Sequence, residues 1–429
     1  MKITKVIAFQ ILDSRGRPTI ATRITLDDGS NHLARVPSGA STGAHEALEL
    51  RDKGTPYAEG FYRGTSVFAA VENVNQVIGP KLIGQTPSID TVDELLNQLD
   101  PTVNHEKLGA NAKLSVSLAT LKAVAHSGNV SIARHFAGNA DLLLPMPMVN
   151  ILSGGAHANR SLDIQDVLVI PNGAKRFSEA LSWIVSVRER AAENAQRLGK
   201  VSHLVADEGG LGLHFASIAE ACDFVISSIQ DVGLRPGTDM SIALDFAATQ
   251  YFRDGKYHLR TENRSLAPSD YITYVSSLVA NQPIISIEDP FAEDDWNSWQ
   301  EFSAIMPHGI QLLGDDLFTT NFDRLKRGIE TKSANSILIK VNQNGLVSGT
   351  QKVLEHARAN LLRTVVSARS GETEDSWLAD LAVGWRAEQI KVGSTHGSER
   401  NAKWNRLIEL EITEATAFAN PFSDSVGSN

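Results

Sequence analysis

Cysteine is almost absent from this chain: Cys222 is the one thiol among 429 residues, so no disulfide can form within the chain. Cys222 lies in an apolar, helix-like stretch, where we expect it to pack as a small hydrophobic side chain. No apolar run approaches the roughly 18 residues that a membrane-spanning helix needs, and the first residues lack the apolar core of a secretory signal. These absences predict a protein of the reducing cytoplasm that does not enter a membrane.

Positive charge is also in short supply. The chain has 40 Lys and Arg residues against 50 Asp and Glu residues, which gives a formal net charge of −10. Nucleic acids and anionic membranes both require a cationic binding surface, so the composition argues against either as a partner. A small anionic substrate remains compatible with this charge if cations gather locally or metal ions bind it.

The length exceeds what one hydrophobic core usually supports, so we expect two domains. Residues 1–135 predict a compact α+β domain, because alternate side chains over 20–26 share one face of a strand and a turn follows at 27–30. Helical patterns come next, including a capping box from Thr91 to Glu94. Two prolines within 141–148 mark the boundary to a second domain, expected over residues 136–429.

In the second domain, short β-branched runs alternate with segments of helical pattern. Helices are expected near 217–233, where Ser217 and Glu220 form a capping box, and near 269–280, 321–332 and 346–360. The runs between them, at 241–245, 284–288, 310–315, 336–340 and 363–367, predict strands. Strands alternating with helices indicate parallel βα units, and this many units predict a closed, TIM-like α/β barrel.

Charged residues end several of these strands. Asp245, Glu288 and Asp315 end three consecutive strands, and Lys340 and Lys391 end later ones. A lone acid after a strand is more often a helix cap, and a lone lysine more often a surface charge. In a barrel, however, the carboxyl ends of the strands meet at one mouth. Three converging carboxylates favour a hard cation such as Mg²⁺, and a lysine beside them can act as a base.

Two further acids, Asp166 and Glu208, lie next to other short apolar stretches. Each either caps a loop or, opposite a lysine and a metal ion, serves as an acid or base in an elimination. From the residues alone, both interpretations stay open.

Nine motifs, in order along nearly the whole chain, resemble those of the enolase family. They are DSRGRPT (13–19), PSGASTG (37–43), GGAHA (154–158), DEGG (207–210), SIEDPFAEDDW (286–296), GDDLF (314–318), IKVNQ (339–343), RSGETED (369–375) and SER (398–400). The resemblance implies an α+β N-terminal domain followed by an enolase-like barrel whose first units depart from simple βα order. It also implies a homodimer or a higher homo-oligomer.

The resemblance further implies a metal site and a base. Asp245, Glu288 and Asp315 would hold a Mg²⁺ that binds the substrate carboxylate, and Ser41, from a mobile loop, would ligate a second Mg²⁺. Lys340 would remove the proton α to that carboxylate, and Lys391 would stabilise the intermediate.

The implied substrate is a small phosphorylated acid. Glu208 would protonate its departing hydroxyl, and Arg369 with Ser370 would hold its phosphate. The other residues expected around the substrate are Asp166, Gln165, His157 and Ala368.

Two departures from the family pattern concern the substrate. The family has Ser–His–Arg–Ser where this chain has Ala368 before Arg369, and a Gln–Glu pair where this chain has Gln165 and Asp166. The second change draws a carboxylate back by about 1.5 Å, one C–C bond. Base and metal site are kept, so these changes predict the same proton chemistry on a different or larger substrate.

Three interpretations follow. The expected one is a phosphonate enzyme like carboxyphosphonoenolpyruvate synthase, an enolase-like branch that would take phosphonoformate as a second substrate. The first alternative is an ordinary phosphopyruvate hydratase, which converts 2-phosphoglycerate to phosphoenolpyruvate. The second alternative is a non-catalytic binding or structural protein.

Overall fold

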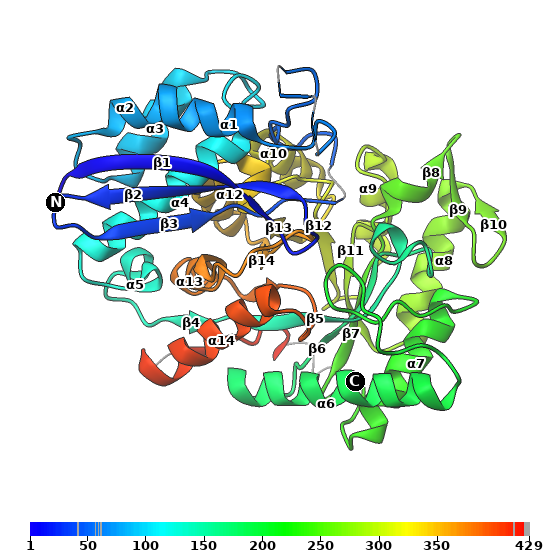
Figure 1. The fold of residues 1–429 in the computed structure, drawn as a ribbon. Coiled ribbons are helices and arrows are strands. Elements are labelled where there is room, and N and C mark those ends of the chain that lie inside the picture. Colours follow the sequence, from blue (N-terminus) through cyan, green and yellow to red (C-terminus); the bar gives the residue numbers. More distant parts are fainter. Residues whose placement is uncertain (41–42, 56, 59, 61, 415–416, 424–429) are drawn as a thin grey trace.

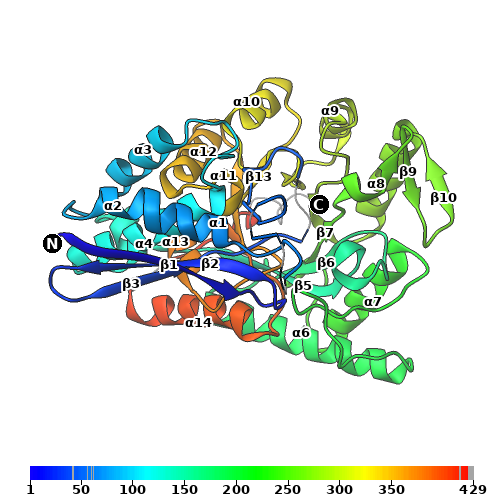
Figure 2. The same cartoon turned by 45° about the horizontal axis from the view of Figure 1, so that its top comes forward.

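The computed structural model describes all residues except 41–42, 56, 59, 61, 415–416 and 424–429. Its N-terminal part is an antiparallel sheet in the order β1-β2-β3, which lies with its helices on one side of a closed barrel (Figure 1, Figure 2). The strands are β1 (Ile3–Leu12), β2 (Pro18–Leu26) and β3 (Asn31–Arg35). The helices are α1 (Phe68–Glu72), the π-helix η1 (Asn73–Ile78), α2 (Gly79–Leu82), α3 (Ile89–Leu99), α4 (Ala110–Ser127) and α5 (Ile132–Ala137).

The predicted order of strands before helices is confirmed. Ile20, Thr22, Ile24 and Leu26 of β2 are all buried, as their alternation predicts. Helix α4 packs across β2 and β3, and most of its residues are buried. A helix that is buried nearly all round belongs to the centre of a structure. Here α4 lies between the sheet and the barrel.

The start of α3 differs from the prediction. The helix begins at Ile89, and its N-cap is Ser88, whose hydroxyl accepts a hydrogen bond from the Thr91 N–H at 3.4 Å. The predicted capping box from Thr91 to Glu94 is therefore wrong. Both serine and threonine can cap a helix, so the sequence offered two starts three residues apart. The N-cap at Ser217 of α7 is confirmed, with its hydroxyl accepting the Glu220 N–H at 3.1 Å.

The large part is an eight-stranded closed barrel in the order β11-β12-β13-β14-β15-β5-β6-β7. Its strands are β5 (Met146–Ser153), β6 (Asp166–Ile170), β7 (Ser241–Asp245), β11 (Ile284–Glu288), β12 (Gln311–Gly314), β13 (Ser336–Ile339), β14 (Arg363–Ser367) and β15 (Gln389–Lys391). Outside the barrel, β4 (Leu143–Leu144) pairs with β16 (Ala417–Phe418), and β8 (Phe252–Arg253), β9 (Lys256–Leu259) and β10 (Arg264–Leu266) form a small sheet.

Helices surround the barrel, and the four predicted there are confirmed to within one or two residues at each end. The helices are α6 (Phe177–Arg197), α7 (Ile218–Asp231), α8 (Pro268–Asn281), α9 (Trp296–Ile305), α10 (Phe322–Thr331), α11 (Val341–Asn344), α12 (Val347–Ala359), α13 (Trp377–Gly384) and α14 (Ser398–Thr413), with short 3₁₀ turns η2 (Gly155–Ala158) and η3 (Ala248–Tyr251). Cys222 of α7 is fully buried, and burial raises its thiol pKa to about 12, as expected of a core side chain.

Strand β6 runs against its neighbours. It pairs antiparallel with β5 and with β7, whereas the other barrel pairs are parallel. The first barrel units therefore depart from βα order, as the resemblance implies. The reversal also has a chemical consequence: the first residue of β6, Asp166, lies opposite the last residue of β7, Asp245, at the mouth of the barrel.

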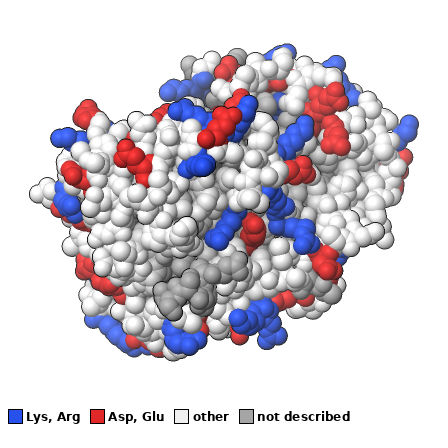
Figure 3. Space-filling model, turned by 180° about the vertical axis from the view of Figure 1, so that it is seen from behind, with Lys and Arg blue, Asp and Glu red and all other residues white. Residues whose placement is uncertain are grey.

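The surface agrees with the negative net charge. On the face in Figure 3, basic and acidic side chains are interspersed, and the residues described there form no continuous basic surface. Within the described part of the chain, no helix combines the length and the apolar character needed to cross a membrane.

The buried ion pair of Glu372 and Lys403 supports the loop after β14. Their charged atoms are 2.8 Å apart, both side chains are almost fully buried, and Glu372 also accepts the Arg369 N–H at 3.2 Å. We expect Lys403→Met to lower the free energy of unfolding by about 3–5 kcal/mol, because it leaves a buried carboxylate without its cation. Urea unfolding measures this change. Arg190→Met, in a partly exposed pair with Glu193, is the control, and an equally small loss in both variants would contradict the prediction.

Candidate active site

The predicted site residues come together at the barrel mouth. A cavity of about 20 Å³ lies there, enough for about one water molecule. It is lined by His157, Gln165, Glu208, Lys340, Ser367, Ala368, Arg369, Ser370, Lys391, Val392 and Gly393. Eight candidate side chains from distant parts of the chain thus share one small space. Ser41, also a candidate, lies outside the described residues.

Two ion-paired groups of charges occupy the mouth. Asp245 and Glu288 are register partners at the ends of β7 and β11, and Lys391 from β15 donates to both carboxylates at 2.6 Å. Just beyond β12, Asp315 accepts a hydrogen bond from Lys340, which follows β13. Parallel strands in register bring these side chains to one level, as their positions at strand ends predict.

The carboxylates suit a hard divalent cation. Asp245, Glu288 and Asp315 offer oxygen ligands only, the kind that Mg²⁺ prefers. Glu288 Oε1 is buried and has no hydrogen-bond partner among the described residues. Burial, and next the charge of Asp245, raise the pKa of Glu288 well above its usual range. A cation there would relieve both effects, so the residues fit the ion, and their ligand role stays a prediction.

A second acidic group lies beside the predicted one. Oxygens of Asp289, Asp315 and Asp316 lie within 4.8 Å of one another. Asp289, however, accepts the backbone N–H of Asp315 at 3.0 Å and that of Asp316 at 2.6 Å. Its carboxylate is therefore engaged in holding the turn after β12, which places Asp315 for the mouth.

Both lysines are held in the charged form. Burial alone would lower the pKa of Lys340, but Asp315 outweighs it and raises that pKa. The pKa of Lys391 is raised well above its usual range in spite of burial, by Asp245 and Glu288. This differs from our expectation of a lysine that loses its proton readily, because the same acids that gather at the mouth stabilise the ammonium ion.

Asp166 and Glu208 differ in their ionisation. Asp166 is fully buried, and burial together with the negative charge of Glu208 raises its pKa well above the usual range. Burial alone would raise the pKa of Glu208, but nearby positive charges, first those of His157 and Arg400, lower it below its usual range. The two acids therefore favour a shared state with the proton on Asp166.

Neighbouring side chains fix both acids. Ser153 donates its hydroxyl to Asp166 Oδ1 at 2.6 Å, and Asn150 donates its amide to Glu208 Oε2 at 3.1 Å. Sequence reasoning missed Asn150, although a polar residue within the apolar run of β5 is a signal that could have found it.

Arg369 is held by an acid that sequence reasoning also missed. Its Nη1 donates to Glu46 Oε2 at 2.8 Å and to Asn342 Oδ1 at 3.1 Å, while Nη2 donates to Glu46 Oε1 at 3.2 Å. Glu46 also accepts the Gly43 N–H at 2.9 Å. A carboxylate thus already pairs with the guanidinium that the family resemblance assigns to a phosphate, so a phosphate would have to share or displace Glu46, and that role stays a prediction.

The remaining candidates lie at the cavity in different ways. Gln165 donates its amide to Asp245 Oδ2 at 2.8 Å, so it contacts a metal-ligand candidate. His157 is buried in η2, and neither ring nitrogen has a hydrogen-bond partner among the described residues. Ala368 presents only a methyl group to the cavity.

Comparisons with known proteins agree with this architecture. The family model "Enolase, N-terminal domain" matches residues 3–136, and "Enolase, C-terminal TIM barrel domain" matches residues 141–423. A relative named "Enolase" from Acidothermus cellulolyticus is 44% identical over 420 residues, which cover 97% of this chain and 96% of the relative. Fold, site and comparisons agree, and the chain belongs to the enolase family.

Proposed function

We propose that this chain catalyses the ordinary enolase reaction, the Mg²⁺-dependent dehydration of 2-phosphoglycerate to phosphoenolpyruvate. The observation that carries the proposal is the single cavity lined by Lys340, Glu208 and Arg369. An elimination needs a base, an acid and a grip on the substrate in one place. The 44% identical relative named "Enolase" supports this reaction over a phosphonate reaction.

The first step falls to Lys340. The C–H bond α to the substrate carboxylate breaks, its electron pair stays on the substrate, and the proton passes to Lys340 Nζ, which has to be a neutral amine to accept it. A cation held by Asp315 would offset the negative charge that raises the pKa of Lys340, and would so favour the neutral form. Asp245, Glu288 and Asp315 would hold Mg²⁺, which supplies positive charge for the carboxylate oxygens. Lys391, between Asp245 and Glu288, adds a fixed positive charge at the same place.

The second step falls to the acid pair. The bond from the β-carbon to its hydroxyl breaks, and the hydroxyl leaves as water after receiving a proton. Glu208 lines the cavity, whereas Asp166 is fully buried and does not line it. The proton that the pair shares would therefore reach the substrate from Glu208, with Asp166 as its source.

Ala368 favours a second candidate. Its methyl group lines the cavity next to Arg369, where the family has an imidazole ring, so the side chain at this position is smaller than in the family, as a larger anion would require. This is the phosphonate interpretation, with phosphonoformate as a further substrate.

The first test is direct. We expect the purified chain with Mg²⁺ to form phosphoenolpyruvate from 2-phosphoglycerate, followed by ultraviolet absorbance of the product, and a chelator to abolish the activity. Lys340→Met should lower kcat at least about 100-fold, because it removes the base. Lys326→Met, on the exposed face of α10, is the control and should match the unaltered chain. No product at any Mg²⁺ concentration would refute the proposal.

The second test separates the two candidates. If the ordinary reaction is native, Ala368→His combined with Asp166→Glu should change kcat/KM for 2-phosphoglycerate less than about tenfold, and phosphonoformate should only inhibit. A gain of about 100-fold, the size of effect expected from a carboxylate misplaced by about 1 Å, would instead favour the phosphonate candidate. Ala368→Ser, which adds a hydroxyl and no ring, serves as the matched control.

A further inference from the structure

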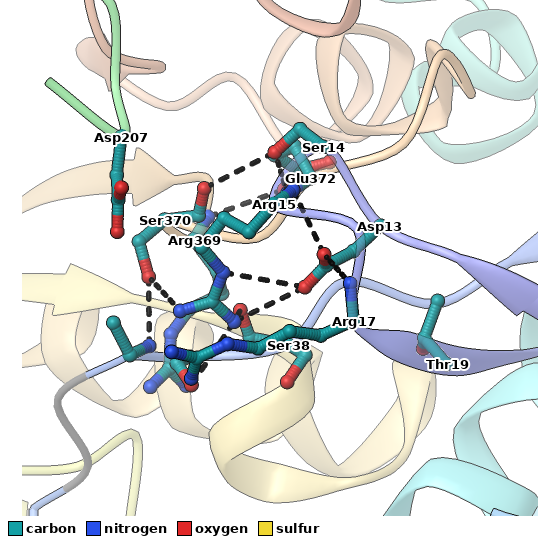
Figure 4. Close-up of polar contacts among 12 residues, drawn as sticks. Asp13, Ser14, Arg15, Arg17, Thr19, Ser38, Asp207, Arg369, Ser370 and Glu372 are labelled. Carbon is teal, nitrogen blue, oxygen red and sulfur yellow. Dashed lines mark hydrogen bonds and ion pairs between the residues drawn. The ribbon is translucent and has the colours of Figure 1, made fainter. Parts of the chain in front are cut away.

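Arg15 reaches from the N-terminal domain into the active site. It lies in the turn between β1 and β2, yet its Nη1 donates to Ser370 Oγ of the barrel at 3.3 Å, and its Nη2 donates to the Ser38 carbonyl at 3.0 Å (Figure 4). The Arg15 side chain is only 7% exposed. A guanidinium from one domain is thus buried against the loop that follows β14 in the other.

Asp13 fixes this guanidinium. Its Oδ2 accepts from Arg15 Nη2 at 3.1 Å and from Arg15 Nε at 3.3 Å, while its Oδ1 accepts the backbone N–H of Arg15 and of Arg17. Asp13 and Arg15 can pack this closely against residue 371 because it is a glycine: a Cβ at this position would lie 2.2 Å from Asp13 Oδ2 and 2.5 Å from Arg15 Nη2. The position of Arg15 is therefore set on several sides.

The hydrogen bonds of Ser370 determine what its hydroxyl can do. A serine hydroxyl has two lone pairs and one hydrogen. Ser370 Oγ accepts from the Ala40 N–H at 2.7 Å and from Arg15 Nη1 at 3.3 Å. Both lone pairs are used, so the hydroxyl can make only one further bond, as a donor. Since Ser370 lines the cavity beside Arg369, that bond suits an anionic oxygen.

The backbone of Ser370 is fixed as well. Its carbonyl accepts from Arg400 Nη2 at 2.5 Å and from Ser14 Oγ at 3.4 Å. The next residue, Gly371, exchanges two backbone hydrogen bonds with Ser38, at 2.7 and 2.9 Å. Rotation of the hydroxyl is thus the remaining freedom, and Arg15 with Ala40 removes it.

We propose that Arg15 is a positioning residue for the phosphate group of the substrate. It directs the Ser370 hydroxyl hydrogen toward that phosphate and makes the hydroxyl a stronger donor through its charge. The inference rests on the proposed function, since it takes the cavity beside Arg369 as the phosphate site. The N-terminal domain then contributes to substrate affinity through a side chain that does not touch the substrate.

The experiment is a double-mutant cycle with Arg15→Met and Ser370→Ala. Arg15→Met should raise KM for 2-phosphoglycerate about tenfold with little change in kcat, as loss of a charge-assisted hydrogen bond implies. In the Ser370→Ala background it should have almost no further effect. Arg17→Met, in the same turn but exposed, is the matched control. An undiminished effect of Arg15→Met without the serine hydroxyl would overturn the proposal.

Two further measurements keep the outcomes distinct. Calorimetry of inorganic phosphate binding to each variant tests the role of Arg15 without any turnover. If 2-phosphoglycerate is not turned over, that failure refutes the proposed function and leaves the role of Arg15 to be decided by the binding data. If Arg15→Met does not fold, Arg15→Lys replaces it, because one ammonium nitrogen cannot occupy both the Nη1 position beside Ser370 and the Nη2 position beside Asp13 and Ser38. Arg15→Lys should weaken phosphate binding several-fold in the chain that keeps Ser370, and should have no effect in the Ser370→Ala background. Equal weakening in the two backgrounds would overturn the proposal.

Discussion

The contact of Lys391 with Asp245 and Glu288 is the interaction on which the mouth of this barrel depends. Two buried carboxylates at the ends of adjacent strands repel each other, and each loses hydration on burial. The Lys391 ammonium offsets both costs with a 2.6 Å hydrogen bond to each acid. The cation has to come from a strand that reaches the same level, and β15 provides it. The order and register of the strands are therefore also an arrangement of charge.

The strand ends could be predicted from the sequence because they combine two strong local signals. A short β-branched run that stops at a charged residue indicates both a buried strand and its orientation toward the mouth. Asp245, Glu288, Asp315, Lys340 and Lys391 were found in this way. The helices around them followed from the 3.6-residue pattern, and their ends deviate by a residue or two because helix ends are set by individual caps.

Other features depend on contacts between distant parts of the chain, which local patterns do not encode. The reversal of β6 is decided by pairing with β5 and β7, and an apolar run such as 167–170 has the same pattern in either direction. Glu46 contacts Arg369 across 323 positions of sequence. Ser88 and Thr91 are close in sequence, but which of them caps α3 depends on which apolar residues of the helix are buried against the rest of the fold. Pattern alone could resolve none of these.

The two departures from the family pattern act on different properties of the site. Ala368 lines the cavity, so losing a ring there changes the shape available to the substrate. Asp166 does not line it: the carboxyl is fully buried, held by Ser153 at 2.6 Å, and its raised pKa favours the protonated form. A shorter side chain at this position alters how a proton reaches Glu208 and leaves the space around the substrate unchanged. Substrate choice should therefore respond to position 368, and the rate of the second step to position 166. A change of substrate through Asp166 alone would be hard to reconcile with this geometry.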